Sequence, residues 1–289
     1  MVTYLIRRLW VSDVDLIKWI KEDLGIMDLT TYLLGIDGRG VAELITREDI
    51  VVSCSEEAAR IYELCGASKV EVLKHSGENA SKGDVLIKVL GDAVSLHKAW
   101  RLAQNVLAIC SGVSTKTHKL VSAAKKVNPK VVVVATRKTP PGLRSLYYKA
   151  VVAGGALPHR MGLSDTVLIF ENHLAFLSNK LFNEVIGRVK SLAPFRKVGI
   201  EVNSIEDAIR AVKAGADMVQ LERFKPSEVI KAIEVLKGIR EDVVVAVAGG
   251  IDEDNIEEYA NTGVDLIVTS APYKATPADI TTRMKAISD

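Results

Sequence analysis

The chain has 289 residues, of which 48% are hydrophobic and 26% are charged, as in an ordinary globular protein and unlike a disordered one. Lys and Arg total 38 against 36 Asp and Glu, so the net charge is only +2, and no general surface for nucleic acid or another polyanion is expected. The longest apolar runs are far shorter than a membrane span of about 20 residues. The first residues also lack a signal-peptide pattern, and we expect a cytoplasmic protein.

The three cysteines, Cys54, Cys65 and Cys110, form no CxxC pair and have no metal-ligand spacing. We expect them to be reduced and buried as small apolar side chains.

Residues 1 to about 110 mix short strands with helices. Glycines divide the short apolar segments, as turns do in a small antiparallel sheet. A helix over Glu56–Cys65 is expected to end at Gly66, and Ser95–Ile109 has the apolar face of a second helix. The predicted strands are Ile50–Ser53, Lys69–Leu73 and Val85–Val89.

From about residue 111 apolar strands alternate with helical segments. Because these strands are apolar almost throughout, we expect them to be buried on both faces of a parallel sheet, which is either doubly wound or a barrel. Ser204 begins one helix with a capping pattern, and Gly215 ends it. The segment Asp279–Ile287 is predicted to be a closing helix. The predicted strands are Val131–Ala135, Val167–Phe170, Val198–Val202, Met218–Leu221, Val243–Val247 and Leu266–Val268.

Polar residues follow most of these strands, at the end where βα barrels carry their chemistry. The cations suit a substrate with several negative charges, and the carboxylates suit a divalent metal or a ribose diol. A Gly-Gly turn can present backbone N–H groups to a phosphate. The residues concerned are Arg137, Lys138, His159, Arg160, Glu201, Glu222, Gly249, Gly250 and Ser270.

Each of these residues also has a purely structural interpretation. Gly249-Gly250 can be a tight turn, Arg137-Lys138 a solvated loop, and His159-Arg160 a structural pair. Glu201 favours function more strongly, because an unpaired carboxylate near the end of an apolar strand is costly. Their coincidence on one rim is stronger evidence than any single residue.

Several motifs together resemble the quinolinate phosphoribosyltransferase family. The most specific is Thr136-Arg-Lys-Thr-Pro-Pro-Gly-Leu-Arg144. The resemblance covers nearly the whole chain, and its other motifs are Asp28-Leu-Thr-Thr31, Arg101 with Asn105, Ser111-Gly-Val-Ser-Thr115, Gly154-Gly155, His159-Arg-Met-Gly-Leu-Ser-Asp165, Asn172-His173, Glu201-Val202, Gly249-Gly250-Ile251 and Thr262-Gly-Val-Asp265.

The resemblance implies an α/β fold of two domains. An N-terminal α/β sandwich would cover residues 1–110, joined by a C-terminal helix at about 276–289. An irregular, open α/β barrel would cover residues 111–275. The family forms homodimers or higher oligomers, in which the N-terminal domain lies against the neighbouring subunit's barrel.

The resemblance also implies a reaction, in which an enzyme transfers the phosphoribosyl group of 5-phosphoribosyl 1-diphosphate to a pyridine carboxylate, using Mg²⁺. With quinolinate the products are nicotinate mononucleotide, CO₂ and diphosphate, a step of NAD biosynthesis. By the same resemblance, carboxylates would be held by Arg101, Arg137 and Arg160 with His159 nearby, the diphosphate by Lys138, the ribose and Mg²⁺ by Glu201 and Glu222, and the 5-phosphate by Ala248, Gly249, Gly250 and Ser270.

This chain departs from the family pattern at several of these positions. Phe170 stands where quinolinate enzymes have a lysine, so it would face the acceptor without a charge. The other departures are Glu222 for aspartate, Ala246 for glutamate, Ala248 for serine, Ser270 for glycine and Lys274 for histidine. Phe170 and the helix SLHKAWRLAQN resemble the ModD branch of the family, whose members are associated with molybdenum transport genes.

Three functions remain open on this evidence. The first is the quinolinate reaction, and the second is a ModD-like transferase with another acceptor. A paralogue that binds ligands without turnover is favoured by the departures at 170, 246, 248 and 270. An aldolase-like barrel is disfavoured, because it needs a Schiff-base lysine and its one fair candidate, Lys138, lies among cations in a phosphate-type loop.

Overall fold

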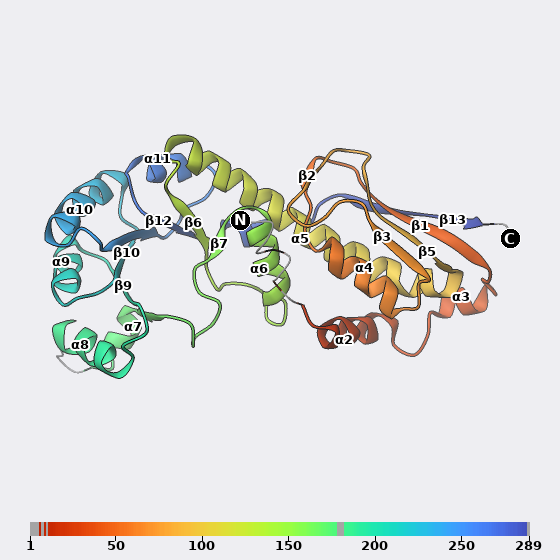
Figure 1. The fold of residues 1–289 in the computed structure, drawn as a ribbon, viewed down its shortest axis with the longest axis horizontal. Helices are drawn as coiled ribbons and strands as arrows, with labels where there is room; N and C mark the ends of the chain where they lie inside the picture. The colour runs from red at the N-terminus through yellow and green to blue at the C-terminus, as the bar shows by residue number, and fades with distance from the viewer. Residues whose placement is uncertain (1–5, 7–8, 10, 178–181, 288–289) are drawn as a thin grey trace. The chain divides into compact units, whose positions relative to one another are not determined.

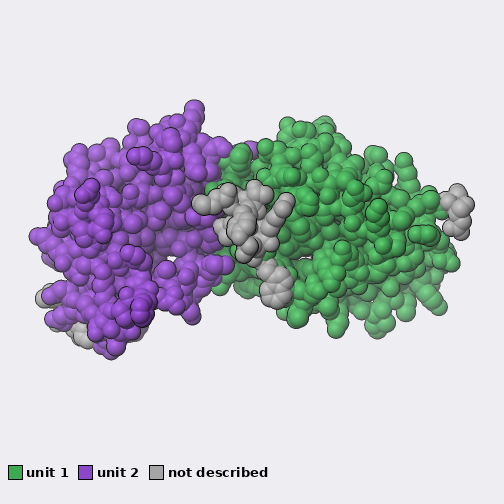
Figure 2. All heavy atoms as spheres, in the orientation of Figure 1, with its two compact units in different colours: residues 1–118, 139–155, 272–289 green, residues 119–138, 156–271 purple. Residues whose placement is uncertain are grey.

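The computed structural model describes Ile6, Leu9 and residues 11–177 and 182–287. The chain forms two compact units (Figure 2). Unit 1 comprises residues 1–118, 139–155 and 272–289, and unit 2 comprises residues 119–138 and 156–271. No single boundary in the chain separates the two units, because residues 139–155 and 272–289 belong to unit 1 although they come after the start of unit 2.

A four-stranded antiparallel sheet forms the centre of unit 1, in the order β13-β1-β5-β3. The strands are β1 (Arg39–Thr46), β3 (Lys69–Val72), β5 (Val85–Asp92) and β13 (Ile280–Ile287). Side chains alternate along β1, and Leu44 is fully buried together with Leu86 and Ile87 of β5. The predictions of strands in 69–73 and 85–89 are confirmed.

The C-terminal segment is a strand, not the predicted helix. Residues 279–287 were expected to form a helix, but β13 pairs antiparallel with β1 over its whole length, from Ile280 opposite Thr46 to Ile287 opposite Arg39. The edge of β1 supplies backbone partners for the segment, and tertiary pairing of this kind outweighs a weak helical pattern. The expected C-terminal helix at about 276–289 is therefore wrong for the described residues.

The helices of unit 1 pack around this sheet and its neighbouring two-stranded ladder. The predicted helix at 56–65 is confirmed as α4, while the one at 95–109 extends much further, as α5, and its last residues belong to unit 2. The elements are α2 (Asp13–Leu24), α3 (Leu29–Leu33), β2 (Ile50–Val51), α4 (Ser55–Leu64), β4 (Asn79–Ala80), α5 (Ala93–Val127) and α6 (Arg144–Ala153).

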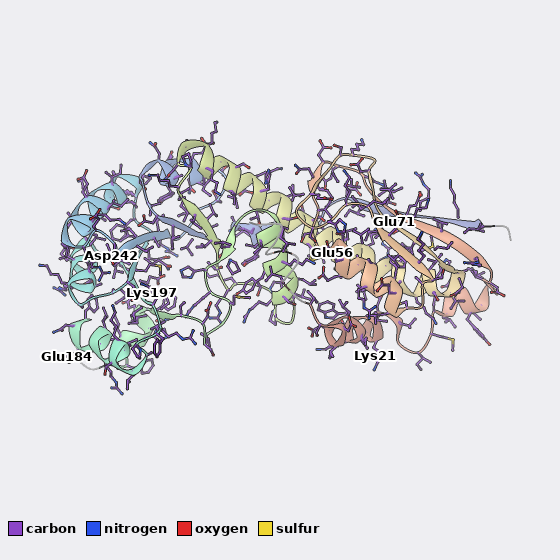
Figure 3. All side chains as sticks on the ribbon, in the orientation of Figure 1. Lys21, Glu56, Glu71, Glu184, Lys197 and Asp242 are labelled. Atoms are coloured by element: carbon purple, nitrogen blue, oxygen red, sulfur yellow. The ribbon has the colours of Figure 1, made fainter. Side chains whose placement is uncertain are left out.

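A buried ion network joins α4 to α6 within unit 1. The Lys149 ammonium donates to Glu57 at 2.7 Å and to Glu56 at 3.0 Å, and its side chain is 4% exposed. Figure 3 labels Glu56 at the start of α4. The network gives the lysine opposite charges in a place where a lone ammonium would be costly.

A seven-stranded parallel sheet forms the centre of unit 2, in the order β7-β6-β12-β11-β10-β9-β8. The successive strands β7 and β8 lie at opposite edges, so the described strands make an open half-barrel, as expected. The strands are β6 (Val132–Ala135), β7 (Leu157–Pro158), β8 (Val167–Ile169), β9 (Val198–Val202), β10 (Met218–Glu222), β11 (Val244–Ala248) and β12 (Leu266–Thr269).

The helices of unit 2 connect these strands and cover the outer side of the sheet, as Figure 1 shows for α9, α10 and α11. Ser204 caps α9, with its hydroxyl accepting from the Asp207 N–H at 3.1 Å, which confirms the predicted helix start. The elements are α7 (Glu171–Leu174), α8 (Phe182–Leu192), α9 (Ile205–Lys213), α10 (Pro226–Ile239) and α11 (Ile256–Asn261), and the 3₁₀ turn η1 (Ala271–Lys274) follows β12.

Among the described residues, no helix combines the length and apolarity that a membrane crossing requires. The cytoplasmic location stays a prediction.

Candidate active site

The parallel sheet of unit 2 collects the predicted site residues, except Arg101, along the carboxyl ends of its strands. The edge at which parallel strands end is where α/β folds place their ligands. In chain order, Arg137 and Lys138 follow β6, His159 and Arg160 follow β7, Phe170 follows β8, Glu201 lies within β9, Glu222 ends β10, Ala248 ends β11 before Gly249 and Gly250, and Ser270 follows β12.

Glu201 is a half-buried carboxylate of the site. It lies opposite Gln220 in the β9–β10 ladder, and the Gln220 side-chain amide donates to its Oε2 at 2.6 Å. Burial raises the pKa of Glu201 and the hydrogen bond from Gln220 opposes the rise; Glu222 raises the pKa further, while Lys138 lowers it. The two carboxylates and the lysine therefore form one electrostatic unit, as a cation or diol site requires.

Glu222 lies beside the glycine turn that follows β11. A Cβ on Gly249 would come within 2.8 Å of Glu222 Oε1 and 2.6 Å of Arg223 Cγ, and the residue has a φ of +97°. Only glycine lets the backbone pass so close to the end of β10. Around Gly250, with a φ of +72°, the space within 4 Å of a Cβ is open. A ligand can therefore approach the turn at Gly250.

Hydrogen bonds hold this turn to its neighbours. The Asn255 amide donates to the Gly250 carbonyl at 3.0 Å, and the Thr269 hydroxyl donates to the Ile251 carbonyl at 2.6 Å. The hydroxyls of Thr136 and Ser270 are 2.7 Å apart and join the ends of β6 and β12. The turn is thus fixed before any ligand binds, which reduces the entropic cost of binding.

The basic side of the site is built around Phe170. The guanidinium carbon of Arg160 lies 5.7 Å from the centre of the Phe170 ring, within cation–π range. The ring also stacks on His173, with centroids 5.7 Å apart, and the Phe170 N–H donates to His173 Nδ1 at 3.0 Å. Phe170 is half-buried at the strand end, so its ring forms part of the site.

The charge on this side comes from arginines. Burial and the neighbouring Arg160 lower the pKa of His159, which favours a neutral imidazole at neutral pH. The Nε of Arg137 is buried and has no hydrogen-bond partner within the described part of the chain. A buried guanidinium donor without a partner suits an anionic ligand.

Arg101 lies on α5 in unit 1, whereas the parallel sheet that carries the other site residues belongs to unit 2. Its side chain is exposed, and the guanidinium carbon lies 4.0 Å from the centre of the Trp100 ring. The predicted grouping of Arg101 with the rim therefore stays a prediction.

Gln220 belongs to the site but was not among the predicted site residues. Its side chain is buried, with 4% exposed, and the detectable signal was an amide in the middle of the apolar strand Met218–Leu221. Asn255, whose amide donates to the Gly250 carbonyl, gave no comparable signal.

Magnesium fits this site only together with a ligand. No cluster of three or more His, Cys, Asp or Glu side chains that could hold a metal occurs within residues 11–177 and 182–287. Glu201 and Glu222 are two carboxylates, and Mg²⁺ is commonly bound by one or two carboxylates plus substrate phosphates. The donors present therefore suit a cation that binds with a phosphorylated substrate.

Sequence comparison identifies both parts of the chain. The family "Quinolinate phosphoribosyl transferase, C-terminal domain" matches residues 113–283, and the corresponding N-terminal domain family matches residues 28–111. The chain belongs to the quinolinate phosphoribosyltransferase family. The resemblance seen in the motifs is confirmed, and membership makes the chain a pentosyltransferase by family.

Relatives of this family member carry two kinds of name. The pyrophosphorylase ModD of Pasteurella multocida is 35% identical over 277 residues, covering 94% of this chain and 97% of the relative. The nicotinate-nucleotide pyrophosphorylase (carboxylating) of Methanothermobacter thermautotrophicus is 35% identical over 278 residues, covering 93% and 98%. These two relatives therefore match the chain over nearly its full length at equal identity.

Solved structures confirm the fold of this family member. The nicotinate-nucleotide pyrophosphorylase from Francisella tularensis superposes with a TM-score of 0.86 at 28% identity, covering 98% of this chain and 96% of that one. NadC from Streptococcus pyogenes superposes with a TM-score of 0.88 at 26% identity, covering 96% and 97%. The predicted pairing of an α/β domain with an open barrel is thus confirmed.

Proposed function

We propose that the protein transfers the phosphoribosyl group of 5-phosphoribosyl 1-diphosphate to a pyridine carboxylate. The observation that carries the proposal is the rim of unit 2, where the Glu201–Glu222 pair lies beside an open glycine turn and the cations stand on neighbouring strands. A ribose diol and a phosphate fit the carboxylate pair and the glycine turn, and an aromatic anion fits the cations.

In this reaction the C1–O bond to diphosphate breaks, and its electron pair leaves with the diphosphate. The lone pair of the acceptor ring nitrogen then forms the new bond to C1. With quinolinate, the 2-carboxyl group leaves as CO₂, its electron pair stays on the ring carbon, and that carbon takes a proton from water. The product is nicotinate mononucleotide.

The residues of this chain position the reactants and stabilise charge. Gly249 and Gly250 would bind the 5-phosphate through backbone N–H groups, and Ala248 and Ser270 would line that pocket. Glu201 and Glu222 would bind the ribose hydroxyls and face the positive charge that develops at C1. Lys138 would meet the departing diphosphate, where a bound Mg²⁺ would supply further positive charge.

Arg137 and Arg160 would bind the carboxylate of the acceptor, with Phe170 against its ring. The planar guanidinium suits this task because it can bind a carboxylate through two parallel hydrogen bonds. A neutral His159 can donate one further hydrogen bond.

The direct test is to incubate the protein with 5-phosphoribosyl 1-diphosphate, Mg²⁺ and a panel of pyridine mono- and dicarboxylates, and to measure diphosphate release. Acceptor-dependent release is expected, and it should stop when EDTA removes the metal. Donor binding without release for any acceptor would instead support the non-catalytic alternative.

A second test addresses the metal and the donor. Glu201→Gln should weaken Mg²⁺-dependent donor binding, measured by calorimetry, because it removes a charge that the cation and the ribose hydroxyls would use. Unchanged affinity in this variant would contradict the role of Glu201.

A ModD-like transferase with another acceptor is the second candidate, and Phe170 is the observation that favours it. The ring occupies the strand end where the family's quinolinate enzymes carry an ammonium, so a less charged acceptor fits better. A link to molybdate transport rests on the ModD relatives alone.

We also propose that the protein is a homodimer or a higher homo-oligomer. The supporting feature is a set of exposed apolar side chains on α2, α3 and the adjoining turns, of the kind that a partner subunit commonly covers. Its members include Val14, Ile26, Tyr32, Leu33 and Leu34, which are between 69% and 94% exposed. In this arrangement Arg101 would reach the acceptor site of the neighbouring subunit.

A further inference from the structure

Gln220 occupies an unusual place on the inner face of the half-barrel. In the sheet register it lies between Glu201 of β9 and Ala246 of β11, and the row continues with Leu266 of β12. On the side away from Glu201, the neighbours of Gln220 in this row are apolar. Ala246 belongs to a buried cluster with Val134, Ala248 and Val268. An amide in this row needs a compensating interaction, because burying a polar group is unfavourable without one.

The hydrogen bond to Glu201 is that interaction. Gln220 Nε2 donates to Glu201 Oε2 at 2.6 Å, while its Oε1 is buried and has no partner within the described part of the chain. The reverse amide orientation would place an oxygen against an ionised carboxylate, where both atoms accept. The amide nitrogen of Gln220 thus binds Glu201, while its amide oxygen has no hydrogen-bond partner within the described part of the chain.

We infer that Gln220 is a positioning residue for Glu201, holding one carboxylate oxygen so that the other stays free for the ribose diol or the metal. This role rests on the proposed transfer reaction. The amide also favours the ionised carboxylate, because a donor bound to a carboxylate stabilises its charged form. Since Gln220 does not reach the solvent-facing side of the site, it acts through Glu201.

Other charges around Glu201 must be separated from this effect. Glu222 on β10 and Lys138 after β6 act on Glu201 directly. Three charges on the helices near β9 are engaged elsewhere: Lys190 of α8 pairs with Asp217, Arg210 of α9 with Asp207, and Glu171 of α7 accepts from Asn203. A change confined to Gln220 therefore leaves the charge pattern intact.

Gln220→Met tests the inference, because methionine keeps the length of the side chain and removes the donor. With the protein carrying ¹³C-labelled glutamate, the Glu201 carboxyl signal is the one missing in Glu201→Gln, and its titration midpoint can be followed without any substrate. We expect the midpoint to rise by about one pH unit in Gln220→Met. The acid limit of Mg²⁺-dependent donor binding should rise in parallel.

The matched control is Gln104→Met, which removes the other glutamine of the chain, an acceptor for Thr282 in unit 1. It should leave the Glu201 midpoint unchanged. Gln220→Glu keeps the side-chain shape and serves as the second variant if methionine prevents folding; its added charge should raise the midpoint further.

The outcomes distinguish the two proposals. An unchanged Glu201 midpoint in both Gln220 variants, with donor binding intact in the wild type, would overturn the role of Gln220 alone. If the wild type binds no donor at any pH, the transferase proposal fails, and the positioning role fails with it even where the midpoint moves. A merely structural glutamine would lower thermal stability without moving the midpoint.

Discussion

Phe170 is the residue at which the acceptor site can be tested most directly. Its ring lies near both Arg160 and His173, at a strand end where the family's quinolinate enzymes present a lysine. Phe170→Lys should strengthen quinolinate binding about 10- to 100-fold, since a charged contact in a partly dry site contributes about 1.5–3 kcal/mol. Calorimetry with quinolinate measures the change.

Phe170→Leu is the control for this variant, because it removes the ring without adding a charge and should not improve quinolinate binding. Efficient turnover of quinolinate by the wild type, at kcat/KM of about 10⁴ M⁻¹s⁻¹ or more, would contradict the interpretation of Phe170.

Some residues of the rim could be predicted from the sequence and others could not. Glu201, Arg137 and the Gly249-Gly250 turn were predicted because each stands after or within a recognisable apolar strand. Gln220 was missed because its role depends on the register between β9 and β10, which places it opposite Glu201. Register between parallel strands is set by the whole sheet and cannot be read from either strand alone.

At the scale of elements, the turn after β11 carries a prediction about phosphate. Gly250 has a φ of +72° and open space where a Cβ would be, so Gly250→Val should block the backbone cradle and weaken donor binding at least tenfold without unfolding the barrel. Valine at a positive φ also adds strain of about 1–2 kcal/mol. The measurement is calorimetry with 5-phosphoribosyl 1-diphosphate.

Gly263→Val provides the matched control, because Gly263 also has a positive φ, +84°, and open space around it, but follows α11. Gly263→Val should lower the free energy of unfolding about as much as Gly250→Val does and leave the affinity for the donor unchanged. Equal loss of affinity in both variants would show that strain, and not access to the turn, accounts for the effect.

The link between α4 and α6 makes a prediction about pH. Burial acts to raise the pKa of Glu56, but the charge of Lys149 and the hydrogen bonds from Ser76 and Lys149 outweigh it and lower the pKa to about 2. A carboxylate with a depressed pKa stabilises the fold above its unfolded value, 4.5, and this stability is lost as the pH falls toward 2. The free energy of unfolding should therefore decrease over that range.

Lys149→Met tests the assignment, because it leaves Glu57 buried without its cation and should cost about 3–5 kcal/mol at pH 7. Urea unfolding at pH 7, 4 and 3 should show that the difference in the free energy of unfolding from wild type shrinks as Glu56 is protonated. Lys190→Met is the control, since it breaks a more exposed ion pair with Asp217 worth about 0–1 kcal/mol. If the free energies of unfolding of Lys149→Met and the wild type differed by the same amount at all three pH values, the ion network would not be the cause of the pH dependence.

Elements also differ in how far the sequence determined them. The buried strands of unit 2 were predicted within a residue or two, since their apolar runs and the polar residues after them mark both ends. The strand β13 was misassigned, because Ile280–Ile287 carries a mixed pattern and is fixed by pairing with β1, some 240 residues earlier in the chain. Pairing at that distance in the chain leaves no local signal.

At the scale of the whole molecule, the family and the open barrel could be predicted from motifs and strand patterns, while the proposed assembly depends on the properties of the surface. The apolar residues of α2 and α3 are exposed, and Arg101 lies on α5 in unit 1. Both features are accounted for if a second copy covers the apolar surface and receives Arg101. A homodimer should be seen by light scattering, and a stable, active monomer would contradict it.

A shared active site makes a sharper prediction, which mixing experiments can test. Arg101→Ala and Glu201→Gln should each abolish most diphosphate release when assayed alone. If Arg101 serves the neighbouring subunit's rim, a mixed dimer of the two variants contains one doubly altered site and one intact site, so activity should reappear on mixing after subunit exchange. If Arg101 serves its own subunit, every site in the mixture keeps one substitution, and activity stays at the level of the single variants.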